Sequence, residues 1–213
     1  MNVPLLILGT RSFAEEIKDL ADETPGVSVV GFVENLDRTR CQSTIDNLPV
    51  HWVDELSQWP DRHRAICALG TTQRVRYTQQ VSRLGMRFHT LIHPTAHLSR
   101  KCSVATGCVV GVRVIVAAHT CLGDHVIVNR GAMIGHHTRI ADHVTIGPGV
   151  NIAGNARVAP RTYLGMGAII RDGVSIGSQV VVGAGSVVTK DVPDRVQVVG
   201  VPARVVKEEI EGL

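Results

Sequence analysis

The stretch VNRGAMIGHHTRIADHVTIGPGVNIAGNARV, residues 128–158, carries an aliphatic residue at every sixth position: Val128, Ile134, Ile140, Ile146, Ile152 and Val158. The same register runs unbroken from Ile92 to Val188, and the residue two places before each aliphatic one is small or β-branched. A period of six is neither the 3.6 of a helix nor the 2 of a simple strand. It is typical of a hexapeptide solenoid, a parallel β-helix.

Such a repeat makes specific geometric predictions. Three hexads form one coil of a triangular prism, with the aliphatic and the small residue pointing inward. Successive coils lie about 4.8 Å apart, so residues eighteen apart stack. Glycine follows the aliphatic residue at positions 111, 123, 135, 147, 165, 177 and 183, where we expect a sharp corner with positive φ. Only Tyr163 among residues 92–188 is aromatic, which suits a narrow prism and disfavours a β-sandwich.

The first part of the chain has a different pattern. Strands are expected at residues 3–9, 27–33, 48–53, 65–70 and 86–91, with helices at 12–23 and 73–84. Ser12 is the expected N-cap of the first helix, because Glu15 follows three residues later. Alternating strands and helices predict a small, Rossmann-like α/β domain. We therefore expect two domains, residues 1–89 and 90–213.

Composition excludes several classes of protein. The net charge is +3 and no basic run suggests a nucleic-acid partner. No apolar stretch reaches the roughly eighteen residues of a membrane span. Residues 1–8 are apolar but precede Glu15 and Glu16 without a cleavage-like site, so they read as a strand and not as a signal peptide. Five cysteines without a CxxC pair favour a reducing, cytoplasmic location.

Ligands of parallel α/β sheets bind at the carboxyl ends of the strands. Here these ends supply the candidate substrate-binding residues Gly9, Thr10, Arg11, Ser12, Phe13, Glu34, Asn35 and Gly70. The first turn reads GTRSFA and lacks the GxGxxG pattern of dinucleotide sites. A nucleotide sugar, with phosphate held at the helix start, is therefore favoured over a dinucleotide, and a turn without a ligand remains the alternative.

Histidines gather in one part of the repeat. His119, His125, His137 and His143 share the fourth place of their hexads, counting the aliphatic residue as first. His119 should stack on His137, and His125 on His143. His136 alone takes the third place, with Gly154 one coil beyond it. Three interpretations are open: a general base, a zinc site shared between subunits of a trimer, or a solvated column.

The chain resembles the bacterial sugar acetyltransferases of the PglD/NeuD type. The resemblance rests on residues 128–158, on GMGAIIRDGVSIGSQVVVGAGSVVTKDVP (165–193), on GVPARV (200–205) and on LIHPTAHLS (91–99). It implies a nucleotide-sugar domain followed by a left-handed β-helix, with acetyl-CoA as co-substrate and no metal. His136 matches the general base, and His137 stands where the family usually has an acid. Gly154 matches the amide facing the thioester oxygen, and Asn129 a residue beside the acceptor. Thr145, Met166 and Ala184 match cofactor contacts.

The expected function is acetyl-CoA-dependent N-acetylation of a nucleotide-linked amino sugar. The same machinery could O-acetylate a sugar hydroxyl, as the sialic-acid relatives do. A γ-carbonic-anhydrase-like zinc protein needs histidines five apart, whereas these are six apart. A non-catalytic scaffold trimer is a further alternative. A homotrimer is expected because one prism offers only a shallow groove and the last coil carries Val181 and Val187 outward.

Overall fold

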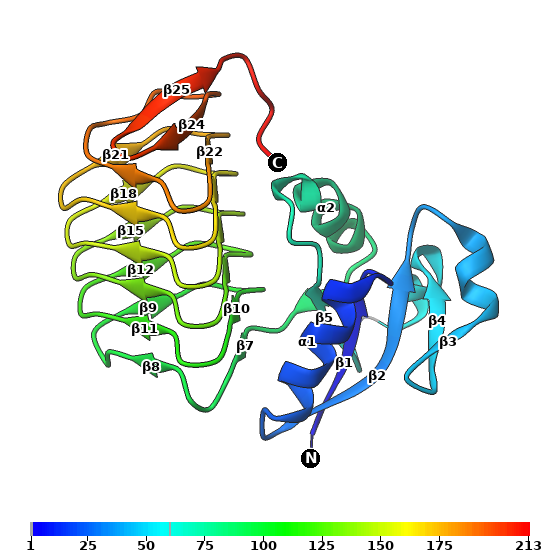
Figure 1. Cartoon of the computed structure of the whole chain (residues 1–213). Coiled ribbons are helices and arrows are strands. Elements are labelled where there is room, and N and C mark those ends of the chain that lie inside the picture. The colour runs from blue at the N-terminus through cyan, green and yellow to red at the C-terminus, as the bar shows by residue number, and fades with distance from the viewer. Residues whose placement is uncertain (1, 60) are drawn as a thin grey trace.

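The computed structural model describes residues 2–59 and 61–213 and places two bodies side by side (Figure 1). The first body is a six-stranded sheet in the order β3-β4-β2-β1-β5-β6. Only the β3–β4 pair is antiparallel. Its strands and helices are β1 (Val3–Leu8), α1 (Ser12–Asp22), β2 (Val27–Glu34), η1 (Arg38–Gln42), β3 (Thr44–Ile45), β4 (Leu48–Trp52), η2 (Val53–Gln58), β5 (Arg64–Cys67), η3 (Thr72–Arg74), α2 (Val75–Arg83) and β6 (Arg87–Phe88).

Apolar residues explain why these elements pack together. Residues 5–8 of β1 are completely buried at the centre of the sheet, and α1 turns Ala14, Ile17 and Ala21 toward it. The predicted cap of α1 is wrong. The N-cap residue is Arg11, which has extended backbone, and Ser12 already lies inside the helix. The antiparallel strand β3 was not predicted, because two residues carry no readable periodicity.

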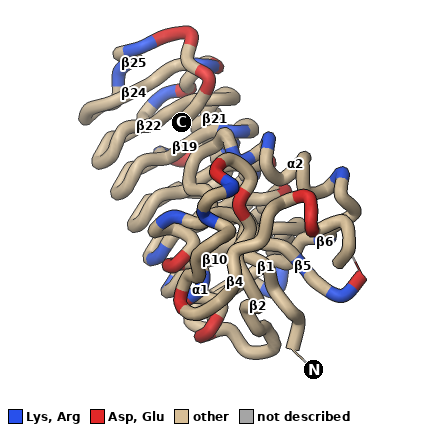
Figure 2. Tube along the Cα trace, turned by 90° about the vertical axis from the view of Figure 1, so that its right-hand side faces the viewer, with Lys and Arg blue, Asp and Glu red and all other residues tan. Residues whose placement is uncertain are grey.

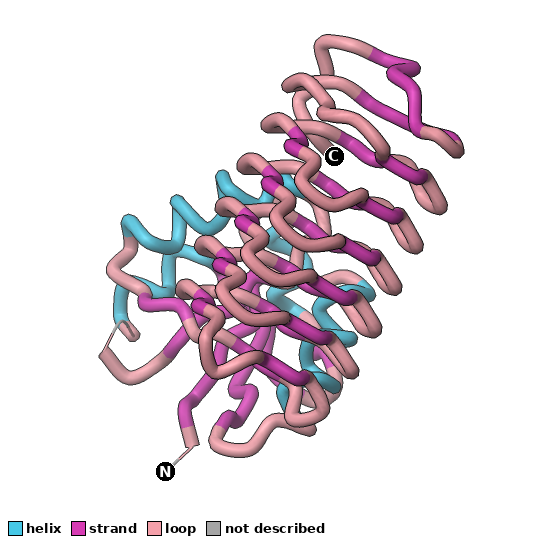
Figure 3. Tube along the Cα trace, turned by 90° about the vertical axis from the view of Figure 1, so that its left-hand side faces the viewer, coloured by secondary structure: helices cyan, strands magenta, loops and turns pink. Residues whose placement is uncertain are grey.

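The second body is a column of short strands stacked in coils (Figure 3), and the strands from β7 to β23 have two residues each. Consecutive strands pass in turn to a first face (β7 to β22 and then β24 and β25), a second face (β8 to β23) and a third face (β9 to β21). The bounds are β7 (Leu91–Ile92), β8 (His97–Leu98), β9 (Ser103–Val104), β10 (Val109–Val110), β11 (Ile115–Val116), β12 (Cys121–Leu122), β13 (Ile127–Val128), β14 (Met133–Ile134), β15 (Arg139–Ile140), β16 (Thr145–Ile146), β17 (Asn151–Ile152), β18 (Arg157–Val158), β19 (Tyr163–Leu164), β20 (Ile169–Ile170), β21 (Ser175–Ile176), β22 (Val181–Val182), β23 (Val187–Val188), β24 (Gln197–Gly200) and β25 (Ala203–Lys207).

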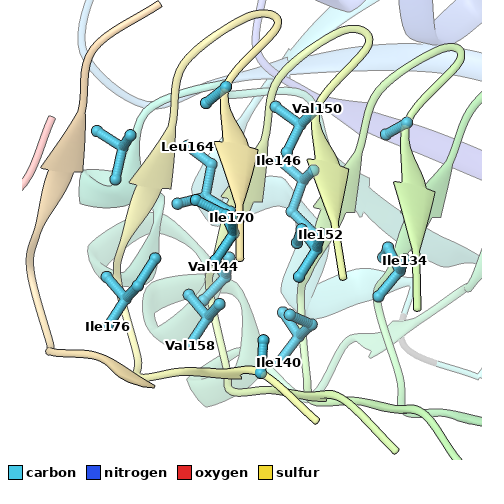
Figure 4. Packing of buried hydrophobic residues seen from close by; sticks show 14 of the residues in the cluster. Ile134, Ile140, Val144, Ile146, Val150, Ile152, Val158, Leu164, Ile170 and Ile176 are labelled. Atoms are coloured by element: carbon cyan, nitrogen blue, oxygen red, sulfur yellow. The ribbon is translucent and has the colours of Figure 1, made fainter. Parts of the chain in front are cut away.

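The predicted register of eighteen is confirmed. Ile134 pairs with Ile152, and Val110 with Val128, in parallel ladders. The aliphatic side chains point into the prism, where Ile134, Ile146 and Ile152 are at most 1 % exposed (Figure 4). Burying one such side chain contributes about 1.5–3 kcal/mol, so the inward columns are the main source of stability of this body.

The expected role of glycine at the corners is wrong. Glycines that directly follow the aliphatic residue do not have positive φ; the left-handed backbone instead occurs at the fourth place of every hexad from Gly107 to Gly185. A Cβ on Gly147 would lie 2.8 Å from both the Leu164 oxygen and the Met166 nitrogen. Glycine is therefore required at the second place because the next coil approaches too closely for a side chain.

The two bodies share a buried contact. Leu91, Val109 and Ile127 project from the first face into the same apolar cluster as Leu5 and Ile17 of the α/β sheet. The C-terminal segment runs from β25 back toward α2 (Figure 1), and the Thr72 amide donates to the Leu213 oxygen at 2.8 Å. The edge of the prism between the second and third faces lies opposite this contact.

The chain leaves the α/β sheet after Phe88 and enters the first face of the prism at Leu91. We therefore retain residues 1–89 and 90–213 as the proposed domains. Acidic and basic positions are interspersed along both bodies (Figure 2). No helix within residues 2–59 and 61–213 has the length and hydropathy needed to cross a bilayer.

Candidate active site

A cavity of about 270 Å³ opens at the carboxyl edge of the α/β sheet. It brings together seven of the predicted substrate-binding residues: Gly9, Thr10, Arg11, Phe13, Glu34, Asn35 and Gly70. Ser12 is exposed at the start of α1 but does not line the cavity. Leu36, Thr71 and Tyr77 also line it and were not predicted, because no charge or motif marks them.

Gly9 shapes the turn from β1 to α1. Its φ is 123°, and a Cβ there would lie 3.2 Å from Leu69 Cδ1 and 3.3 Å from the Ala68 oxygen. The following turn is held by Arg40, whose Nη1 donates to the Thr10 oxygen at 3.0 Å. Arg11 remains exposed at the rim. One glycine is thus enough to bring this turn against the end of β5.

Glu34 organises the opposite wall of the cavity. Its carboxylate accepts the Thr10 hydroxyl and the amides of Asn35, at 2.9 Å, and Leu36, at 2.8 Å. Burial opposes the charged form, but these hydrogen bonds outweigh it and lower the pKa of Glu34 below its ordinary value. Both carboxylate oxygens are engaged within the protein, so Glu34 fixes the shape of the wall.

The predicted cofactor residue Thr145 lies apart from His136. It is 2 % exposed on the first face, against the α/β sheet. Its hydroxyl donates to the Gly70 oxygen at 3.0 Å and accepts from Arg74 Nη1 at 2.6 Å. In this arrangement Thr145 supports the wall of the cavity at Gly70.

His136 projects from the corner between β14 and β15, on the edge opposite the α/β sheet. Its Nδ1 lies 3.1 Å from Nδ1 of His137, and both rings are exposed. The His137 ring stacks on His119 with centroids 4.7 Å apart, as the register predicts. A Cβ on Gly154 would lie 2.7 Å from His136 Cε1, so only glycine lets the ring lie this close to the next coil.

His125 and His143 also stack, with centroids 4.9 Å apart, but they lie in the contact between the two bodies. His143 Nε2 is 3.0 Å from the Thr78 hydroxyl of α2. Burial, reinforced by His125 and Arg74, lowers the pKa of His143 to about 4, and burial also lowers the pKa of His125. Both imidazoles pack in the contact between the two bodies, and their lowered pKa values favour the neutral form at neutral pH.

The other predicted cofactor residues divide between two edges. Gly154 lies beside His136. Met166 and Ala184 are exposed at the corners after β19 and β22, on the edge between the first and second faces. One chain therefore places them across the full width of the second face from His136.

Asn129 lies in a separate groove of about 130 Å³ between α1 and the coils. Its Nδ2 donates to the Ile146 oxygen at 3.0 Å. The neighbouring Arg130 pairs with Glu16 of α1 at 2.6 Å. Asn129 is thus not brought together with His136 within one chain.

No three His, Cys, Asp or Glu residues in the described part of the chain are arranged as metal ligands. Arg74 is a buried charged residue that sequence reasoning missed. The chain has 22 lysines and arginines, and nothing in the sequence around Arg74 distinguishes it from the others.

Comparison with known proteins covers both the α/β body and the β-helix. Residues 155–190 match the family model "bacterial transferase hexapeptide (six repeats)". A mutant of perosamine N-acetyltransferase from Caulobacter crescentus, in complex with CoA and GDP-perosamine, is 28 % identical, with 96 % of this chain and 97 % of that chain covered and a TM-score of 0.89. The acetyltransferase domain of PglB from Neisseria gonorrhoeae, in complex with acetyl coenzyme A, is 29 % identical, with coverages of 97 % and 100 % and a TM-score of 0.89.

WeeI from Acinetobacter baumannii shares the fold, at 24 % identity and a TM-score of 0.88, with 96 % of this chain and 100 % of that chain covered. A search of curated proteins finds no match. The similarities confirm the α/β domain followed by a left-handed β-helix and the resemblance to sugar acetyltransferases of the PglD/NeuD type. They also confirm the enzyme class, an acyltransferase.

Proposed function

We propose that the protein transfers an acetyl group from acetyl-CoA to the amino group of a nucleotide-linked sugar. The observation that carries this proposal is similarity over nearly the whole chain to a sugar N-acetyltransferase bound to CoA and GDP-perosamine. Two features of the chain support the proposal: a cavity at the strand ends, which we assign to the nucleotide, and a histidine that faces a glycine one coil away.

His136 is the proposed general base. In the tautomer in which His136 Nδ1 donates to His137 Nδ1, Nε2 of His136 has a free lone pair. This nitrogen removes the proton from the attacking amine as the amine adds to the thioester carbon. His137 accepts the hydrogen bond that an acid would accept in the family, and so fixes the His136 ring and its tautomer.

Gly154 is the proposed oxyanion donor. Within the part of the chain that the structure describes, its amide donates to no protein acceptor. It lies beside the His136 ring, where the thioester oxygen gains charge as the tetrahedral intermediate forms. When that intermediate collapses, the C–S bond breaks and the proton held by His136 passes to the departing sulfur, which releases CoA as the thiol and leaves the amide product.

The active site is proposed to form between copies in a homotrimer. The nucleotide cavity belongs to the body that covers the first face, whereas His136 lies on the opposite edge of the prism. A sugar held in one copy therefore reaches the His136 of another. An active site shared between two copies would also bring Gly154 of one copy close to Met166 and Ala184 of another. Within one chain Gly154 lies on a different edge of the prism from Met166 and Ala184.

The second face supplies the proposed interface. Ile115, Met133 and Ile169 project from it in one column and are 43 %, 42 % and 47 % exposed. Val181, expected to contribute, is 8 % exposed, because β24 and the C-terminal residues run along that end of the first face. Val187 lies on the second face, half-buried, and extends the column.

Free-thiol release from acetyl-CoA tests the proposal. UDP-, GDP- and dTDP-linked amino sugars are supplied in turn, with His136→Ala as the control protein. We expect CoA release with at least one amino sugar and a product that resists hydroxylamine, as an amide does. A hydroxylamine-labile ester would overturn N-acetylation in favour of O-acetylation. No release with any amino sugar or sugar hydroxyl would overturn the proposed activity.

A further inference from the structure

Arg74 is the largest completely buried side chain among the residues that the structure describes, with 0 % exposure. Its guanidinium makes five hydrogen bonds. Nε and Nη2 donate to the His125 oxygen at 3.2 and 2.9 Å, Nη2 also donates to the Val144 oxygen at 2.9 Å, and Nη1 donates to the Thr71 oxygen at 2.8 Å and to Thr145 Oγ1 at 2.6 Å. All the acceptors are neutral carbonyl or hydroxyl oxygens.

The buried cation has no acidic partner. Within residues 2–59 and 61–213 no carboxylate forms an ion pair with Arg74. The thiols of Cys67 and Cys108 lie near it, and burial raises the pKa of each to about 11, so both are neutral. Burial lowers the pKa of Arg74 to about 10, so the guanidinium remains charged at neutral pH. Burying a charge without a counter-charge costs free energy that packing alone does not require.

The position of this charge indicates its use. Two residues of the cavity wall, Gly70 and Thr71, are tied to the guanidinium: Thr71 directly through its oxygen, and Gly70 through the Thr145 hydroxyl. The charge therefore lies immediately behind the wall of the proposed nucleotide site. Because the protein interior screens weakly and Arg74 has no ion-pair partner among the described residues, its positive potential extends into the cavity. The Glu34 carboxylate on the opposite wall is the negative charge that this potential must offset before an anion binds.

We propose that Arg74 is a positioning residue for the acceptor, and that it favours the diphosphate of a nucleoside diphosphate sugar by its charge without touching it. This inference rests on the proposed function. It differs from a purely structural role, in which Arg74 would only join the two bodies through its hydrogen bonds. The two roles predict different results for a variant that folds normally but lacks the positive charge of Arg74: only the positioning role predicts weaker nucleotide binding.

The first test compares Arg74→Gln with Arg74→Lys. Binding of GDP and UDP is measured by calorimetry, and KM and kcat by free-thiol release. Arg74→Gln is expected to weaken nucleotide binding and raise the acceptor KM about tenfold or more, with kcat and the KM for acetyl-CoA little changed. Arg74→Lys keeps the charge and is expected to retain most of the affinity.

The second test leaves Arg74 in place. Thr145→Asp puts a carboxylate against the guanidinium, whereas Thr145→Val removes the hydroxyl without adding charge. The Asp variant is expected to lose nucleotide affinity about tenfold, and the Val variant much less. If Arg74→Gln fails to fold, this pair of variants still tests whether the charge of Arg74 favours nucleotide binding.

Three results would overturn the inference: unchanged nucleotide affinity in folded Arg74→Gln, equal affinities for the Asp and Val variants at position 145, or no binding of GDP or UDP by the wild-type protein. A wild-type protein that binds nucleotide with the expected charge dependence but releases no CoA would instead overturn the proposed function alone.

Discussion

At the scale of single residues, the proposed base His136 has an unusual partner in His137. An imidazole partner accepts one hydrogen bond but, unlike a carboxylate, brings no negative charge to stabilise the imidazolium of His136. The partner must therefore act by fixing the ring and the tautomer. The stack of His137 on His119 supports this role, because it restricts rotation of the His137 ring.

Replacing His136 by Ala should lower kcat by about 10²-fold or more, through loss of the general base. His137→Ala should cost less, and His137→Glu should retain or increase activity. Steady-state free-thiol release measures all three, with Arg139→Ala on the neighbouring strand as a matched control. Near-wild-type turnover by a folded His136→Ala protein would show that another group is the base. His125 and His143 are not expected to replace it, because His125 is buried in the contact between the two bodies and Nε2 of His143 is engaged there with the Thr78 hydroxyl.

His143 predicts a pH dependence of stability. Its pKa falls from the ordinary 6.5 to about 4 in the folded protein, because burial disfavours the imidazolium. Between these values the unfolded chain binds a proton that the folded chain does not, so the free energy of unfolding decreases as pH falls from 6.5 to 4. The lowered pKa of His125 acts in the same direction. Urea midpoints across this window should fall less steeply for His143→Gln. Parallel slopes for both proteins would rule out this contribution.

At the scale of the structural element, the corners of the prism contain two kinds of glycine, which differ in the reason for having no side chain. Gly147→Ala should destabilise the protein by about 1–3 kcal/mol, because its Cβ would press on the next coil. Gly149 has φ of 65°, and a Cβ there would meet no atom within 4 Å, so Gly149→Asn should cost less than about 1 kcal/mol, since Asn tolerates this backbone. Urea denaturation measures both, and equal losses would contradict the distinction.

The turn from β1 to α1 carries its own prediction. If Arg11 at the rim contacts the phosphates, Arg11→Ala should raise the acceptor KM by several-fold to tenfold, the range for losing one charged contact, and leave the KM for acetyl-CoA unchanged. Arg38→Ala, on the nearby η1, is the matched control for a general loss of positive charge. Equal effects of Arg11→Ala on both substrates would mean that the turn is not the nucleotide site.

How far the sequence predicts each element depends on how much periodicity it has. The coils were predictable residue by residue because each inward column repeats many times, and the stacking of His119 on His137 followed from that register. The N-cap of α1 and the end of β5, predicted at residue 70 and found at Cys67, depend on single residues and were less accurate. The burial of Thr145 and Arg74 could not be predicted, since it depends on how the α/β sheet docks onto the first face.

At the scale of the whole molecule, the exposed apolar column on the second face should hold the proposed trimer together. Met133→Asp and Ile169→Asp place charges in this proposed interface, and we expect both to give smaller species in light scattering and to lose activity. Arg157→Asp, on the third face, should leave the assembly intact. A wild-type protein that is a stable, active monomer would contradict the shared active site.

The left-handed backbone at the fourth place of each hexad has a consequence for how this protein can change. Where glycine or asparagine occupies that place, the conformation costs little, but His119, His125, His137 and His143 adopt it with bulky side chains at about 1 kcal/mol or more each. Selection for thermal robustness alone would therefore drive these histidines toward glycine or asparagine. At His137 such a substitution would remove the partner of the proposed base, so a gain in stability at this corner would be expected to lower turnover.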